Sequence, residues 1–107
     1  MTSFDKREEG FEKKFALDEE QKFKAVARRN KLLGLWVAEL LGKSGADADA
    51  YAKEVVASDF EEAGDGDVLR KVTEDLTAKG VTVSEQDIYA KLGELMGVAA
   101  AQIKSGQ

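Results

Sequence analysis

Residues 17–41 read LDEEQKFKAVARRNKLLGLWVAELL and carry the longest helical pattern in the chain. Their apolar residues recur at intervals of three, seven, four and three, which places them on one face of a helix. The members of this stripe are Phe23, Val26, Leu33, Val37 and Leu40, with Leu32 and Trp36 beside it and Asn30 interrupting it. We therefore expect a long helix that buries this face, including Trp36, in a core.

A glycine, Gly34, lies inside this predicted helix. Glycine in a helix interior is less favourable than alanine by about 1 kcal/mol, so its presence needs a reason. We interpret Gly34 as a point of close approach to a neighbouring helix.

Further glycines divide the rest of the chain into three more helical segments, which start near residues 44, 65 and 84. Each segment has an apolar face with helical spacing. The start and stop signals are Ser44 with Asp47 and Ser84 with Asp87 as capping boxes, Asp65 or Asp67 as an N-cap, and Gly80 as a left-handed stop. Gly93 and Gly97, four residues apart, predict a second close helix contact. The predicted fold is all-α, a four-helix bundle-like domain over residues 19–107.

The N-terminal residues 1–18 have a different pattern. Phe4, Phe11 and Phe15 fall within about 40° of one another on a helix, and charged residues surround them. A stripe this thin suits a groove on another protein. We predict a flexible arm, frayed or disordered when free because isolated short helices are marginal in water, and helical when bound. The alternative is that the arm folds back onto the bundle.

Composition excludes several classes of function. The 107 residues contain no cysteine and no histidine, which removes the commonest metal ligands and acid–base groups. We therefore expect no enzyme, no metal and no cofactor. The formal net charge of −5 argues against binding to nucleic acid or to an anionic membrane surface. With no apolar run long enough to span a bilayer and no signal-peptide pattern, the predicted location is the cytoplasm.

Three charged clusters have both a structural and a functional interpretation. Residues 46–75 contain ten acids and three bases, which suits a solvated face or a docking patch for a basic partner. Arg28, Arg29 and Lys31 either contact phosphate weakly or pair with this acidic region. Residues 59–70 resemble a calcium-binding loop, but Arg70 stands where that loop needs a glutamate.

Five segments of the chain resemble a known family. They are FDKRE at 4–8, FEKKFA at 11–16, ARRNKLLGLW at 27–36, SGADADAYA at 44–52 and DFEEAG at 59–64. On these residues the chain resembles the zeta inhibitor subunits of alphaproteobacterial F-type ATP synthases, over its whole length. The resemblance implies a small four-helix protein that blocks ATP hydrolysis by inserting its N-terminal segment between the catalytic subunits and the rotor.

The resemblance carries the inhibitory segment onto residues 1 to about 18. Its expected partners are the catalytic and rotor subunits, and the free chain is expected to be a monomer that associates with the membrane only through ATP synthase. The expected partner-binding residues are Phe4, Asp5, Arg7, Glu8, Phe11, Glu12, Lys13 and Phe15. The alternative hypothesis is a stand-alone helical adaptor or a bundle that binds nucleotide weakly at Arg28, Arg29 and Lys31.

Overall fold

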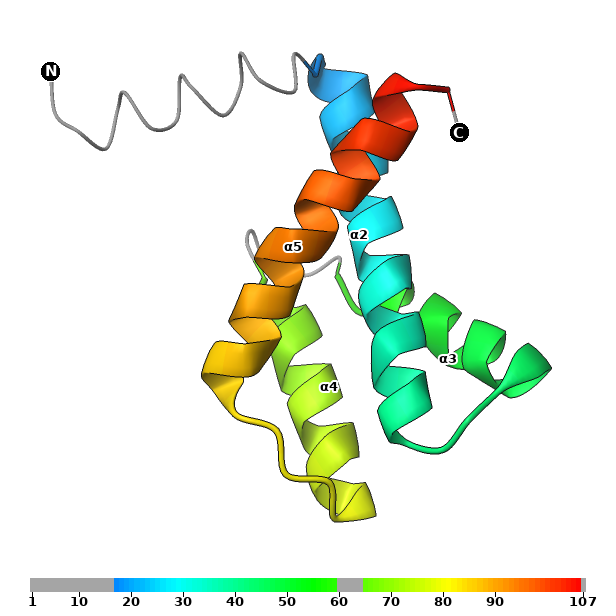
Figure 1. The fold of residues 1–107 in the computed structure, drawn as a ribbon, viewed down its shortest axis with the longest axis vertical. Coiled ribbons are helices and arrows are strands. Elements are labelled where there is room, and N and C mark those ends of the chain that lie inside the picture. The colour runs from blue at the N-terminus through cyan, green and yellow to red at the C-terminus, as the bar shows by residue number, and fades with distance from the viewer. Residues whose placement is uncertain (1–16, 60–64, 107) are drawn as a thin grey trace, which may run out of the picture.

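The computed structural model describes residues 17–59 and 65–106, and over these ranges it contains four helices and no strand (Figure 1). The helices are α2 (Glu19–Leu40), α3 (Gly45–Ala57), α4 (Gly66–Lys79) and α5 (Glu85–Lys104). The prediction of an all-α fold is thus confirmed for the described residues. Residues 1–16, which include most of the predicted arm, lie outside these ranges. No helix within these ranges is long and apolar enough to cross a membrane.

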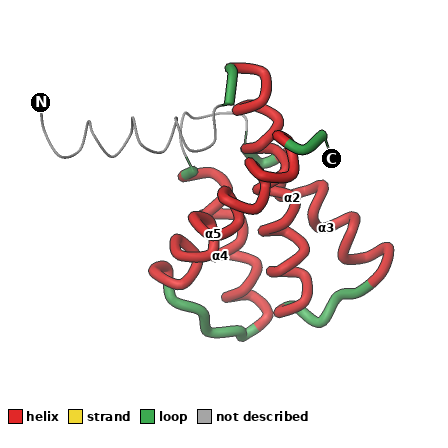
Figure 2. The backbone as a smooth tube through the Cα atoms, turned by 45° about the horizontal axis from the view of Figure 1, so that its top comes forward, coloured by secondary structure: helices red, strands yellow, loops and turns green. Residues whose placement is uncertain are grey.

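Helix α2 is the centre of the domain. It packs extensively against both α3 and α5 and also touches α4, whereas α4 makes only small contacts with α2 and α3. The start of α2 lies beside the end of α5, and α3 extends to the other side of α2 (Figures 1 and 2). Helix α2 can contact three neighbours because its buried positions form two adjacent rows. One row consists of Ala25, Arg29, Leu33 and Val37, and the other of Asn30, Gly34 and Ala38.

All four helices contribute to one core. Its largest fully buried apolar side chains are Leu33, Val37, Val55, Val68, Val72 and Ile88. Trp36 and Leu40 are only partly buried and pack against this core from its edge, where the Lys91 ammonium lies 5.5 Å from the centre of the Trp36 ring. Burial of Leu33 and Val37 is thus confirmed, whereas the prediction that Trp36 is buried in the core holds only in part.

The first half of α2 departs from the prediction. Phe23, predicted to face the core, is 78% exposed. It lies in the second turn of α2, in a groove that is also lined by Val56 from the last turn of α3 and Ile103 near the end of α5. The prediction was wrong for Phe23 because spacing alone does not show where neighbouring helices end.

The predicted close approach at Gly34 is confirmed. A Cβ atom built on Gly34 would lie 2.6 Å from the Cα atom of Ala52 and 3.2 Å from the Cβ atom of Val55, both on α3. Gly93 has no such neighbour, because a Cβ atom added there would meet nothing within 4 Å. Close packing at Gly93 was therefore a wrong prediction.

The helix ends follow the sequence signals only in part. Gly80 ends α4 with a φ of +82°, as predicted. At the start of α5 the Ser84 side chain accepts a hydrogen bond from the Asp87 N–H at 3.0 Å, so the Ser84 cap is confirmed but only this half of the predicted capping box forms. Ser44 occupies the N-cap position of α3 but its side chain makes no capping bond. The prediction of a capping box there was wrong, and Gly45 directly after it has a φ of +57°, outside the helical region. Asp65 likewise occupies the N-cap position of α4 without a side-chain capping bond.

Gly34→Ala tests the close contact between α2 and α3. We expect it to lower the free energy of unfolding by about 1–3 kcal/mol, because the new methyl group collides with backbone and outweighs the higher helix propensity of alanine. Gly93→Ala is the matched control and should raise stability by up to about 1 kcal/mol. Urea denaturation of both variants measures the difference, and equal effects at the two positions would contradict the close contact.

Candidate functional site

The predicted partner-binding residues of the arm, from Phe4 to Phe15, lie outside the described residues. Their roles stay predictions. The described structure begins at Leu17 and shows how the chain enters α2. The Asp18 Oδ1 atom accepts a hydrogen bond from the Gln21 N–H at 2.7 Å, and the Gln21 Oε1 atom accepts one from the Asp18 N–H at 3.2 Å. This reciprocal capping box sets Glu19 as the first residue of α2.

The sequence analysis did not identify this cap, although the spacing of Asp18 and Gln21 is a usable signal. The Asp18 backbone has a ψ of 179°, so it is extended and the helix does not continue through it. Leu17 and Asp18 therefore both lie outside α2. The start of α2 coincides with the predicted end of the arm at residue 18.

The basic cluster of α2 separates into three environments. The Arg29 side chain is buried, and its Nη2 atom donates to Asn30 Oδ1 at 2.8 Å and to Asp65 Oδ1 at 2.7 Å. Arg28 donates from Nη1 to Gln102 Oε1 on α5 at 2.8 Å. Lys31 is exposed. The predicted pairing of this cluster with the acidic region is confirmed for Arg29.

Asn30 extends the same polar contact. It is 1% exposed, and its Nδ2 atom donates to Asp59 Oδ2 at 2.8 Å. Asp59 lies just after α3 and Asp65 just before α4, so Arg29 and Asn30 together attach both neighbouring chain segments to α2. We call these four residues, Arg29, Asn30, Asp59 and Asp65, the polar clasp. Two acids of the loop that resembles a calcium site are thus engaged by α2, and the described residues contain no group of three or more metal-ligating side chains.

An apolar groove lies along the first half of α2. It has a volume of about 390 Å³, and its lining residues are Phe23, Lys24, Ala27, Arg28 and Lys31 of α2, Val56 of α3 and Ile103 of α5. Phe23 is the most exposed of the large apolar side chains in the described structure. The three ionisable residues of the lining are all basic. The sequence analysis missed this groove because it assigned Phe23 to the core.

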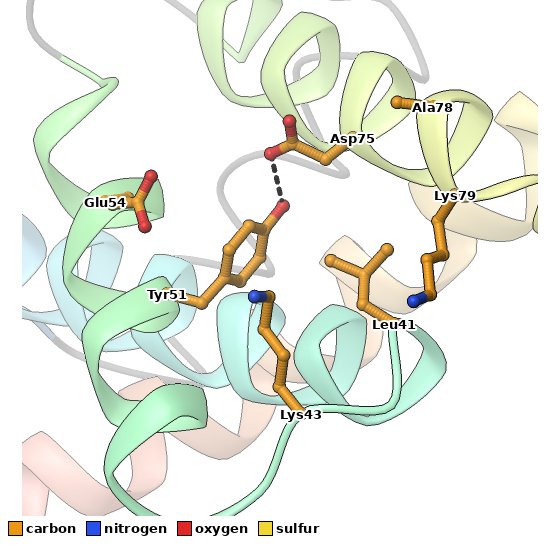
Figure 3. A pocket seen from close by; sticks show the side chains of 7 residues that line it. All are labelled: Leu41, Lys43, Tyr51, Glu54, Asp75, Ala78 and Lys79. Atoms are coloured by element: carbon orange, nitrogen blue, oxygen red, sulfur yellow. Dashed lines mark hydrogen bonds between the residues drawn. The ribbon is translucent and has the colours of Figure 1, made fainter.

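A second pocket, of about 360 Å³, lies between the end of α2, α3 and α4, where Lys43 and Lys79 stand beside Leu41 (Figure 3). In its wall the Tyr51 hydroxyl donates to Asp75 Oδ2 at 2.7 Å (Figure 3). The Lys71 ammonium also contacts this oxygen, at 3.0 Å, and lies 5.2 Å from the centre of the Tyr51 ring. These contacts join α3 to α4, and the sequence analysis did not identify them.

Burial raises the pKa of Tyr51 far above the ordinary tyrosine value, and the hydrogen bond to Asp75 raises it further. Burial alone would lower the pKa of Lys71, but its hydrogen bonds to Asp75 and Glu54 and their negative charges raise it. Tyr51 therefore stays neutral and Lys71 stays charged at physiological pH. Such groups hold helices together and are poorly suited to accept or release a proton during a reaction.

A comparison with known protein families shows which family this chain belongs to. A model of the family described as ATPase inhibitor subunit zeta matches residues 1–102. The chain belongs to this family. The match covers residues 1–16 as well as all four helices up to the last turn of α5. The family named from the sequence resemblance is thus confirmed, and its name is that of an ATPase inhibitor subunit.

A solved structure supports the fold of this zeta-family chain. A protein studied by solution NMR shares 58% sequence identity with it and superposes with a TM-score of 0.71. The alignment covers 80% of this chain and 98% of that chain. No curated protein matches the chain.

The polar clasp predicts a large effect at one arginine and a small one at a nearby lysine. Arg29→Ala leaves the buried Asn30 oxygen without this donor and should lower the free energy of unfolding by about 1–3 kcal/mol. Lys24→Ala, which removes an exposed ion pair to Glu20, should cost no more than about 0.5 kcal/mol. Urea denaturation measures both, and a loss at Arg29 no larger than that at Lys24 would show that the clasp is energetically unimportant.

Tyr51→Phe predicts a pH-dependent effect. At pH 8 the loss of the hydroxyl should cost about 1 kcal/mol, whereas Tyr89→Phe, at a position 52% exposed, should change stability by less than about 0.5 kcal/mol. Because folding raises the pKa of Tyr51, its contribution is fully present below the unfolded-state value near 10 and is lost as the pH rises above it. The stability difference between wild type and Tyr51→Phe should therefore shrink between about pH 9 and pH 11. A constant difference over this range would contradict the assignment.

Proposed function

We propose that this chain inhibits ATP hydrolysis by a rotary F-type ATP synthase and that residues 1–18 form the inhibitory segment. In this proposal the segment inserts between the catalytic subunits and the rotor, and the helical domain stays outside and anchors it. The observation that carries the proposal is the family match, which extends over the arm as well as the helices.

The arrangement of apolar residues also supports a separate role for the arm. Helices α2 to α5 form a common core from their own side chains, between Leu33 and Leu92 in sequence. Three of the five phenylalanines, Phe4, Phe11 and Phe15, instead precede the capping box at Asp18. Buried aromatic and arginine side chains are the usual energetic centres of protein interfaces. We therefore assign these phenylalanines to apolar pockets of the ATPase.

Charged residues of the arm would complete the interface. Arg7 and Lys13 would pair with acids of the cleft, and Asp5, Glu8 and Glu12 with bases. A segment that fits only one rotor position stalls rotation by stabilising that state. This mechanism needs no catalytic residue, in keeping with a regulatory subunit. The free chain would be a monomer that becomes peripheral to the membrane when it binds the synthase.

The alternative, an adaptor or a weak nucleotide-binding bundle, has less support. Its phosphate site would need Arg28, Arg29 and Lys31 together. The Arg29 guanidinium, however, is buried and bonded to Asn30 and Asp65, which leaves only the other two side chains on the surface.

Deletion of residues 1–16, which keeps Asp18 and its capping box, should abolish inhibition of ATP hydrolysis while the thermal unfolding of the helical domain changes little. Phe11→Ala combined with Phe15→Ala should weaken inhibition about 100-fold or more, since each ring would leave a desolvated pocket at a cost of about 2 kcal/mol or more. The measurement is an ATPase assay on the purified catalytic head, with circular dichroism melts of each variant. Full inhibition by the truncated chain would reject the insertion mechanism. A collapse of its melting transition would show that the arm is part of the fold.

A further inference from the structure

The groove along the first half of α2 exposes a large apolar side chain, Phe23. Phe23 leaves 78% of its surface in water, although burying such a side chain is favourable. Phe23, Ala27 and Lys31 follow one another at intervals of four residues and form a straight strip, about 12 Å long, along one face of α2. Val56 and Ile103 line the groove from α3 and α5. These dimensions suit about two turns of a helix laid into the groove.

The charge of this groove contrasts with that of the chain. The chain has a net charge of −5, yet Lys24, Arg28 and Lys31 are the only ionisable residues among the lining side chains. Lys24 forms an exposed ion pair with Glu20 at 3.2 Å, but Glu20 is not among the lining residues. The Arg28 bond to Gln102 fixes one of the basic side chains between α2 and α5. A basic rim around an apolar strip favours a ligand with acidic flanks and an apolar face.

Two occupants from this chain itself fit poorly. Residues 1–16 contain four acids and four bases, and Lys13 and Lys14 are the charged residues of this segment closest to the groove in sequence. With equal numbers of acids and bases, this segment has no net negative charge to complement the basic rim. A second copy of the chain docked through a two-fold axis would place two identical basic rims against each other, which repels.

We propose that this groove, which we call the α2 groove, docks an amphipathic helical segment of the inhibited ATPase whose apolar face is flanked by Asp or Glu. The inference rests on the proposed function, because it takes the ATPase as the partner. It adds an anchoring contact outside the arm. The α2 groove begins five residues after Asp18, so an occupant there would lie next to the point where the arm leaves the bundle. The arm would then block rotation, and the α2 groove would hold the inhibitor in place.

The test uses the full-length chain and the purified catalytic head, and it measures binding and maximal inhibition separately. Phe23→Ser should weaken binding about 30-fold, which corresponds to about 2 kcal/mol at 1.4 kcal/mol per tenfold, without lowering inhibition at saturation. The control Tyr89→Ser, at an exposed aromatic outside the α2 groove, should stay within twofold of wild type. Binding of Phe23→Ser within threefold of wild type would overturn the proposal.

The basic rim has its own test. Lys24→Glu with Lys31→Glu should weaken binding and make it less sensitive to salt than wild-type binding. Lys53→Glu with Lys79→Glu introduces the same change in net charge away from the α2 groove and should bind like wild type. Equal effects of the two charge pairs would show a general dependence on net charge and overturn the assigned rim. Because Phe23, Lys24 and Lys31 are exposed, melting curves of these variants should match that of wild type.

Cross-linking identifies the occupant directly. The chain has no cysteine, so Phe23→Cys provides a single attachment point for a photoreactive probe, with Tyr89→Cys as the control. A cross-link from position 23, but not from position 89, to a subunit of the ATPase supports the proposal. A cross-link only to a second copy, or only to residues 1–16, overturns it.

The arm variants distinguish a failure of the insertion mechanism from a failure of the α2 groove proposal. If Phe11→Ala with Phe15→Ala abolishes inhibition and Phe23→Ser binds like wild type, the α2 groove proposal fails alone. If the arm variant inhibits fully while Phe23→Ser binds weakly, the insertion mechanism fails and the docking surface stands.

Discussion

A guanidinium and a carboxamide buried on one turn of α2 set the positions of the neighbouring helices. Arg29 and Asn30 are almost fully removed from water, and a buried polar group without a partner carries a penalty of about 1–3 kcal/mol. Their partners are Asp65 at the start of α4 and Asp59 just after α3. The clasp therefore holds both helices against α2, at the level where Gly34 allows α3 to approach closely. The clasp thus fixes the end of α3 and the start of α4 beside the core.

The same contacts explain how an acidic chain presents a basic surface. Many acids of the middle region act within the fold, as Asp65 does with Arg29 and Asp75 with Tyr51 and Lys71. The bases Lys24, Arg28 and Lys31 stand on either side of Arg29 and Asn30 in α2 and line the α2 groove. Internal pairing thus leaves opposite charges unevenly distributed over the surface. An uneven distribution favours one orientation of a partner over others.

In the proposed mechanism the arm and the helical domain, which are joined at Asp18, have different roles. The capping box between Asp18 and Gln21 defines where α2 begins, and neither residue belongs to residues 1–16. An arm that becomes ordered only on binding loses conformational entropy at that step and gains less affinity from its contacts. A preformed surface on the folded domain does not carry this loss. A docking groove next to the arm would therefore supply affinity, and the arm would supply the block to rotation.

Sequence patterns predicted the features that depend on residues close together in the chain. The all-α class, the Ser84 cap, the stop at Gly80 and the tight contact at Gly34 follow from helical periodicity, local capping or the absence of a side chain. The exposure of Phe23 and the loss of Asp65 as a capping side chain depend on partners elsewhere. Arg29 and Asp65 are 36 residues apart, and α3 and α5 end beside Phe23. A periodic pattern shows which face of a helix is apolar, but only the tertiary structure shows which part of that face is buried by neighbouring helices.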